Sequence, residues 1–267
     1  MVEKGLASNP AADLDIVALP KPEVRHNTHL RMAELPAFLR KLSAYGGHAN
    51  TVGGIRLLLL TGVRTGELRA ATPEQFDLER RLWIIPPEIV KQLQVRERRE
   101  SEEIPPYIVP LSRQAIEIVK ALLTAKLLSN SHLLSHRSRP KDSISENTLN
   151  TALQRMGYKG RLTGHGIRGT LSTALNELGY EQKWGDAQLS HADPSQVRRS
   201  YNHAEYVEQR RVMMQDWADR LDCWEAGLPQ PAGPLAEGSQ NLEFITALLK
   251  SAAGQGLKLH YAAAAVV

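Results

Sequence analysis

Apolar residues recur at helical spacing along most of the chain, starting at about residue 33. The stretches MAELPAFLRKLSAYGG and TVGGIRLLLLTG each carry an apolar face and end on glycine, which is typical of a helix followed by a turn. The same period returns in SRQAIEIVKALLTAKLL, ENTLNTALQRMG and GIRGTLSTALNELG, with Ser112 and Thr163 as expected N-caps. The pattern therefore predicts a mostly helical protein.

A further long amphipathic helix is predicted in the second half of the segment 193–224. Its apolar stripe consists of Tyr206, Met213, Trp217, Leu221 and Trp224. Aromatic residues on such a stripe usually pack against the rest of a domain. We therefore expect this stripe to pack in the core or at an interface.

Three short segments between the helices have the character of strands. FDLERRLWIIPPEIVKQ predicts two of them and YIVPLS the third. The charged stretch LQVRERRESEEIPP lies between breakers and predicts an exposed hairpin loop. The expected fold is thus mainly α (α+β), a helical domain with a small three-stranded antiparallel sheet.

Composition changes toward both ends of the chain. Residues 1–28 contain three prolines and no sustained period, so we expect a linker or the tail of a missing upstream domain. Residues 29–225 form the main domain in this interpretation. Residues 226–267 combine a proline-rich linker with an apolar helix around FITALLK.

The overall composition narrows the class of protein. Hydrophobic residues make up 42% of the chain and charged residues 23%, which is ordinary for a globular protein. The single cysteine, Cys223, excludes a disulfide framework and a cysteine-based zinc site. The N-terminus lacks a signal-peptide core, and the apolar run at 57–60 is too short to span a bilayer. We expect a soluble, cytoplasmic protein, and its pI of about 9.2 weakly suggests a polyanionic partner.

Arg64 is the first candidate for chemistry, because it lies between an apolar helix and a new helix that begins near Thr65. Free N–H groups at a helix N-terminus and a guanidinium can together hold phosphate oxygens. The alternative is a structural ion pair with Glu67, which the local sequence alone favours. Glu67 could also serve both interpretations, because an ion pair with Arg64 would orient the guanidinium toward a phosphate.

His165 and Arg168 form a second candidate, three residues apart on one helical face behind Thr163. Two such groups near a helix N-terminus repel each other unless an anion lies between them. An isolated HxxR motif is otherwise a solvent-exposed pair. Both interpretations stay open at this point.

Two tyrosines follow His191, which ends a short apolar segment. Tyr201 has polar neighbours and could act as a nucleophile or fill a core. Tyr206 is its rival, but the apolar stripe assigns Tyr206 to packing. The sequence therefore favours Tyr201 as the nucleophile.

Several motifs, taken together and in order, form a specific set: TGVRTGELR, then a lysine in a strand, then HGIRGT, LSHADP and SYNH. With them, the chain from about 28 to 225 resembles the tyrosine recombinase (phage integrase) family, in particular the integrases of satellite phages and prophage islands. The resemblance implies a catalytic set of Arg64, Lys91, His165, Arg168, His191 and Tyr201. Lys91 is the only lysine between Trp83 and Pro110, where the family places one on a hairpin.

The resemblance also implies the reaction, in which the Tyr201 hydroxyl attacks a DNA phosphodiester and leaves a 3′-phosphotyrosyl enzyme and a free 5′-hydroxyl. Arg64 and Arg168 would hold the non-bridging oxygens, and His191 would add a hydrogen bond. His165 would accept the tyrosine proton, and Lys91 would protonate the leaving oxygen. No metal or other cofactor is expected, because no acidic cluster with the character of metal ligands accompanies these residues. No ATP is expected, because the covalent bond conserves the energy of the phosphodiester.

We therefore expect a site-specific recombinase that integrates or excises a phage or genomic island. The alternatives are a type IB topoisomerase-like nicking and closing enzyme and a catalytically silent DNA-binding remnant. The family implies double-stranded DNA as the partner, a homotetramer on DNA with a C-terminal segment exchanged between protomers, and an accessory directionality factor. Without DNA we expect a monomer or a weak dimer. The C-terminal helix could equally fold back on its own domain.

Basic residues outside the motifs are candidates for contacts with the DNA backbone. For each of them taken singly, a solvated face is the simpler interpretation. The candidates are Arg137, Arg139, Lys141, Arg198 and Arg199, together with Arg210 and Arg211.

Overall fold

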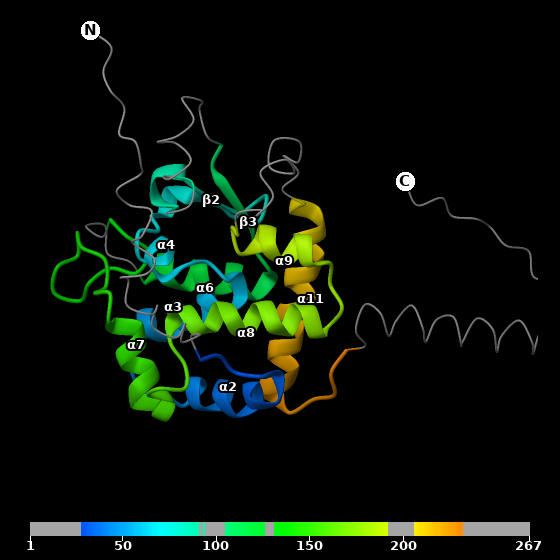
Figure 1. The fold of residues 1–267 in the computed structure, drawn as a ribbon. Coiled ribbons are helices and arrows are strands. Elements are labelled where there is room, and N and C mark those ends of the chain that lie inside the picture. The colour runs from blue at the N-terminus through cyan, green and yellow to red at the C-terminus, as the bar shows by residue number, and fades with distance from the viewer. Residues whose placement is uncertain (1–27, 91–92, 94–104, 126–130, 192–205, 232–267) are drawn as a thin grey trace, which may run out of the picture.

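The computed structural model describes residues 28–90, 93, 105–125, 131–191 and 206–231. Its helices, in chain order, are α2 (Leu35–Ser43), α3 (Ala49–Thr61), α4 (Thr65–Arg69), α6 (Arg113–Thr124), α7 (Thr148–Leu153), α8 (Gly164–Glu177), α9 (Gln182–Gln188) and α11 (Val207–Ala226) (Figure 1). The strands are β1 (Phe76–Asp77), β2 (Leu82–Ile85) and β3 (Tyr107–Pro110). Short 3₁₀ turns occupy Met32–Glu34, Pro73–Gln75 and Pro87–Ile89, and a π turn, Gln154–Tyr158, follows α7.

Helix α3 lies at the centre of the molecule, because its sequence is apolar around most of its circumference. It packs against α6, α7, α8 and α11. Leu57, Leu58 and Leu59 are at most 2% exposed. The helix ends at Gly62, whose φ of 67° is a left-handed conformation that favours glycine. A sharp turn there starts α4 beside the end of α3.

The three strands form one antiparallel sheet in the order β1-β2-β3. Trp83 of β2 is fully buried and stacks on Phe76 of β1 at 5.0 Å between ring centroids. Across the other edge of β2, Trp83 is opposite Val109. The prediction of a mainly helical domain with a small three-stranded antiparallel sheet is confirmed.

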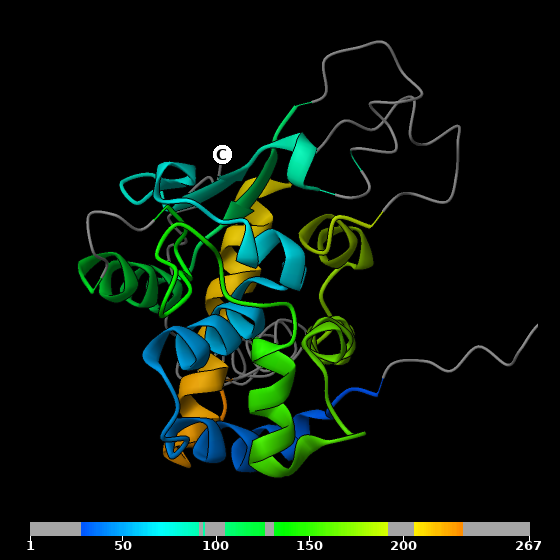
Figure 2. The same cartoon turned by 90° about the vertical axis from the view of Figure 1, so that its left-hand side faces the viewer.

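Helix α11 runs from the sheet to α2, in contact with β3 at one end and α2 at the other (Figure 2). Met213, Trp217 and Leu221 are buried, and the Trp217 Nε1 donates to the Leu59 carbonyl at 2.8 Å. The predicted helix and this part of its stripe are therefore confirmed. The inclusion of Tyr206 is wrong, because Tyr206 precedes the helix as its N-cap with a φ of 49°.

The predicted N-caps of α6 and α8 are confirmed. The Ser112 hydroxyl accepts from the Ala115 amide at 3.2 Å, and the Thr163 hydroxyl accepts from the Gly166 amide at 3.0 Å. Each hydroxyl satisfies an amide that has no partner within the helix. In the described part of the chain, no helix is both long and apolar enough to cross a membrane.

Candidate active site

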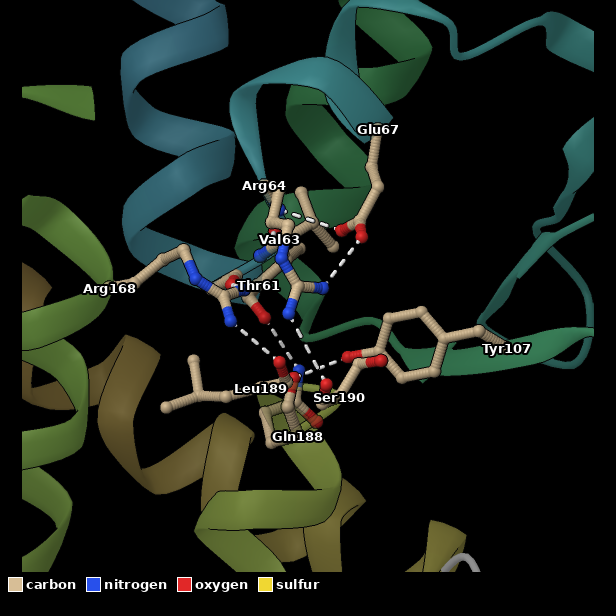
Figure 3. A network of polar contacts seen from close by, with 10 residues as sticks. Thr61, Val63, Arg64, Glu67, Tyr107, Arg168, Gln188, Leu189 and Ser190 are labelled. Atoms are coloured by element: carbon tan, nitrogen blue, oxygen red, sulfur yellow. Dashed lines mark hydrogen bonds and ion pairs between the residues drawn. The ribbon is translucent and has the colours of Figure 1, made fainter. Parts of the chain in front are cut away.

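Arg64 is held by a buried carboxylate at the start of α4. Glu67 is 2% exposed. Its carboxylate accepts from the Arg64 backbone amide at 2.7 Å and from the Arg64 Nη1 at 2.9 Å. The Arg64 Nη2 donates to the Ser190 carbonyl at 3.3 Å. The ion pair that the local sequence favours therefore exists. It also orients the guanidinium toward the residues that follow α9, and 20% of that side chain remains exposed (Figure 3).

Arg168 enters the same region from α8. Its Nη1 donates to the Gly62 carbonyl and its Nη2 donates to the Leu189 carbonyl at 2.6 Å. The residue is 4% exposed, so the alternative interpretation of His165 and Arg168 as a solvent-exposed pair does not hold for the arginine. His165 on the same helix is exposed. Arg168 thus joins the ends of α3 and α9 from beneath the surface that bears His165.

His191 follows the end of α9. Its Nδ1 lies 3.2 Å from the Asp186 carboxylate, and Ser190 before it has a φ of 48°. This left-handed residue turns the chain sharply after the helix. The turn presents the Leu189 and Ser190 carbonyls to the two arginines and places His191 beside them.

The charges of this cluster act on one another. Partial burial, followed by Arg168, Arg64 and His191, lowers the pKa of the His165 imidazole below its ordinary value. Burial also lowers the pKa of the His191 imidazole. The hydrogen bond with Asp186 raises this pKa, whereas Arg168 and Arg64 lower it further. Burial and Arg64 lower the pKa of the Arg168 guanidinium to about 10, so it is still cationic at neutral pH. The site therefore combines two cations with two neutral imidazoles, which suits a bound anion.

The two halves of the site meet at Gly164. Its amide donates to the Asn150 side chain at 2.8 Å, and a Cβ on it would lie 2.5 Å from Thr65 Cγ2 at the start of α4. Only a residue without a side chain allows α8 and α4 to start this close together. Because His165 and Arg168 follow Gly164, this contact sets their distance from Arg64.

Gly164→Ala is expected to lower the free energy of unfolding by about 1–3 kcal/mol through overpacking. Alanine otherwise stabilises a helix by only about 0.5–1 kcal/mol over glycine, so the clash outweighs the gain. Adding Thr65→Ser removes Cγ2 and should recover most of the loss in denaturant unfolding. Gly185→Ala on α9 is the control, because its Cβ would meet nothing within 4 Å, and it should not destabilise. Equal effects at Gly164 and Gly185 would contradict the close approach.

Apart from Arg210 and Arg211, the remaining predicted residues form two groups. Lys91, Tyr201, Arg198 and Arg199 lie outside the described residues, as do residues 94–104 of the predicted hairpin loop. Arg137, Arg139 and Lys141 are exposed on a loop that the Ser135–Ser143 bridge closes. Within the described residues, no group of three His, Cys, Asp or Glu side chains could hold a metal ion.

The prediction that Arg210 contacts the DNA backbone is wrong. The residue is 1% exposed, and it donates to the Ala187 carbonyl at 3.1 Å and to the Ile108 carbonyl at 2.6 Å. Such a residue joins α11 to α9 and β3 and is not available to a DNA phosphate. Its neighbour Arg211 is partly exposed and pairs with Glu208 at 3.0 Å. Two adjacent arginines at the start of a helix face opposite environments, which the dipeptide itself does not reveal.

Sequence reasoning missed Tyr107 and Gln188. The buried Tyr107 hydroxyl donates to the Gln188 carbonyl, and the Gln188 side-chain amide donates to the Thr61 carbonyl at 2.6 Å (Figure 3). Neither residue belongs to a motif of the sequence analysis. The available signal was the position of Gln188, three residues before His191, at the end of a helix.

Comparisons with known proteins identify the family to which the chain is similar. The model of the phage integrase family matches residues 50–208. The chain is 41% identical over 227 residues to the prophage integrase IntZ of Escherichia coli strain K12, and the match covers 85% of this chain and 52% of that protein. It is 40% identical over 227 residues to the integrase of Enterobacteria phage P4, covering 80% of this chain and 50% of that protein. The chain thus spans about half the length of these curated relatives.

The fold is similar to that of a solved integrase. The Tn1549 transposon integrase, solved in complex with transposon right end DNA, superposes with a TM-score of 0.53 at 15% identity. The match covers 78% of this chain and 71% of that one. At this identity the likeness concerns the fold alone.

Proposed function

The chain belongs to the phage integrase family, and from that membership we propose that it carries the catalytic centre of a site-specific recombinase. The reaction is the cutting and rejoining of double-stranded DNA through a 3′-phosphotyrosyl intermediate, for the integration or excision of a phage or genomic island. The convergence of Arg64 and Arg168 on the turn after α9 is the observation that carries the proposal. These arginines are 104 positions apart in sequence, yet carbonyls of neighbouring residues orient them both.

The geometry supports a role for each described residue. A phosphodiester under attack gathers negative charge on its non-bridging oxygens, and cations fixed before the reaction stabilise that charge without reorganisation. Arg64 and Arg168 supply those cations. His191 donates a further hydrogen bond from the ring nitrogen that does not face Asp186, and it does so as the imidazolium, because the proton of the neutral ring lies on Nδ1 beside the carboxylate. Glu67 holds Arg64 in place and touches no reacting atom.

His165 is the proposed proton acceptor. It is exposed on the same helix as Arg168, and its lowered pKa keeps the imidazole neutral at pH 7. The Tyr201 oxygen bonds to phosphorus while the bond from phosphorus to the 5′-oxygen breaks. The tyrosine proton passes to His165, and Lys91 donates a proton to the departing 5′-oxygen. The reverse sequence reseals the DNA without an external energy source.

DNA and protein partners are part of the proposal. The exposed Arg137, Arg139 and Lys141, with Arg198 and Arg199, are proposed to contact the DNA backbone. The Tn1549 transposon integrase was solved in complex with transposon right end DNA, and this supports duplex DNA as the substrate of the present chain. We further propose a homotetramer on DNA, an accessory directionality factor, and a domain division at about residues 28 and 226.

The test uses the full chain on a nicked DNA duplex that contains the attachment core of the element encoding it. EDTA is present and ATP is omitted. The expected product is a protein–DNA adduct that resists denaturation and disappears when a strand with a free 5′-hydroxyl is supplied. DNA binding without an adduct would favour the silent remnant. Relaxation of a supercoiled plasmid without exchange between two sites would favour the topoisomerase-like enzyme.

A further inference from the structure

The end of α9 offers four successive backbone carbonyls to four different side chains. The donors and acceptors are Arg210 to Ala187 at 3.1 Å, Tyr107 to Gln188, Arg168 to Leu189 at 2.6 Å, and Arg64 to Ser190 at 3.3 Å. Carbonyls at a helix C-terminus have no partner within the helix and carry partial negative charge. Cationic and hydroxyl donors therefore bind them well.

These donors fall into two pairs on different structural elements. Arg64 and Arg168 come from α4 and α8 and belong to the proposed phosphate site. Tyr107 and Arg210 come from β3 and α11, which pack against each other. Figure 3 shows Tyr107 reaching the turn from the side of the sheet, away from Arg168 (Figure 3). The turn is thus held on one side by the scaffold and holds the two arginines on the other.

Tyr107 is suited to a fixed donor role. It is 8% exposed, and its backbone is paired with Ile85 in the sheet, so the ring starts from a rigid position. Burial raises the pKa of its phenol to about 12. The hydroxyl is therefore protonated at physiological pH and can donate to the Gln188 carbonyl throughout the working range.

Gln188 extends the connection toward α3. Its side-chain amide donates to the Thr61 carbonyl at 2.6 Å, and the next residue, Gly62, accepts from Arg168. Gln188 is fully buried, so these bonds are shielded from water. A shift of Gln188 would change both carbonyl groups that bind Arg168.

We infer that Tyr107 is a positioning residue, whose hydroxyl fixes the end of α9 so that the Leu189 and Ser190 carbonyls orient Arg168 and Arg64 and His191 faces the same site. This inference rests on the proposed recombinase function. It differs from the roles proposed for the catalytic set, because Tyr107 acts only through the backbone of the turn. It also assigns a role to a buried tyrosine that the reaction itself does not use.

Tyr107→Phe removes one hydroxyl and leaves the ring in place. In single-turnover reactions on the nicked duplex, we expect adduct formation to slow about tenfold, since small misplacements of positioning groups reduce rates steeply. The dissociation constant for the duplex should stay at the wild-type value, because the ground-state contacts with DNA are retained. A loss confined to the chemical step separates positioning from binding.

Tyr180→Phe is the matched control. The Tyr180 hydroxyl donates to the Asp216 carboxylate of α11 at 2.8 Å, so this variant also loses one tyrosine hydrogen bond. Thermal unfolding of both variants measures the structural cost. The control should form the adduct at the wild-type rate. Equal slowing in both variants, or no slowing in Tyr107→Phe, would overturn the inference.

A second readout needs no DNA. If Tyr107→Phe loosens the turn, Arg168 and Arg64 change position relative to the His165 imidazole, and the pKa of His165 changes in an NMR titration. Tyr180→Phe should leave the His165 titration unchanged, and an unchanged titration in Tyr107→Phe would count against the inference. If the wild-type protein forms no adduct, the proposed function fails, and this titration alone decides the role of Tyr107.

Discussion

Tyr201→Phe is expected to abolish the covalent protein–DNA adduct, with a loss of more than about 10⁴-fold in the rate of its formation. Phenylalanine keeps the ring but has no oxygen to attack phosphorus, and the remaining groups of the site cannot form the covalent bond. The measurement is denaturing electrophoresis of the full chain incubated with a nicked duplex in which the released strand diffuses away. DNA binding by the variant should persist, because the arginines are unchanged.

Tyr206→Phe is the matched control for this experiment. Tyr206 is the N-cap residue of α11, and its ring lies 5.6 Å from the Lys183 ammonium. Its substitution should leave adduct formation close to the wild-type rate. The opposite pattern, with the adduct retained in Tyr201→Phe and lost in Tyr206→Phe, would assign the nucleophile to Tyr206.

Arg168→Lys is expected to slow adduct formation by about 10²- to 10³-fold, the usual cost of removing one preorganised donor from a transition-state site. Lysine retains the positive charge but has no planar fork that can serve two carbonyls and a phosphate at once. In the free protein, the Gly62 or Leu189 carbonyl would lose its partner. One such buried group without a partner costs about 1–3 kcal/mol, so the free energy of unfolding should also fall.

Arg161→Lys separates the local effect from a general effect of removing a guanidinium. Arg161 lies just before α8 and pairs on the surface with Glu34 at 2.7 Å. Its substitution should change neither the rate nor the stability appreciably, since exposed ion pairs contribute little. A wild-type rate in Arg168→Lys, measured on protein that is shown to be folded, would remove Arg168 from the proposed mechanism.

The parts of the fold that follow from local patterns were predictable. The glycine after α3, the Ser112 and Thr163 caps and the three strands are each determined by a few neighbouring residues. Tyr206 shows where this reasoning fails. Its spacing matches the stripe of α11, but the backbone of Tyr206 is left-handed. The helix therefore begins only at the next residue, Val207.

The site itself was predictable only as a set of motifs. The resemblance of these motifs to a known family pointed to Arg64, His165, Arg168 and His191. It could not show that backbone carbonyls orient both arginines. Every residue type has a carbonyl, so such contacts leave no pattern in the sequence. The same holds for Arg210, whose burial depends on β3 and α9, which are distant in sequence. Tyr107 and Gln188 were missed for that reason.

The central claim is that residues from α4, α8 and the end of α9 surround one phosphate. An NMR titration of His165 with and without inorganic phosphate tests this claim most directly. In the free protein, the pKa of His165 should lie below its ordinary value of 6.5, because partial burial and the neighbouring cations disfavour the imidazolium. A bound phosphate dianion favours the imidazolium, so the pKa should rise in the wild type and rise less in Arg168→Lys. A pKa of His165 that starts at 6.5 or above and does not respond to phosphate would contradict the shared site.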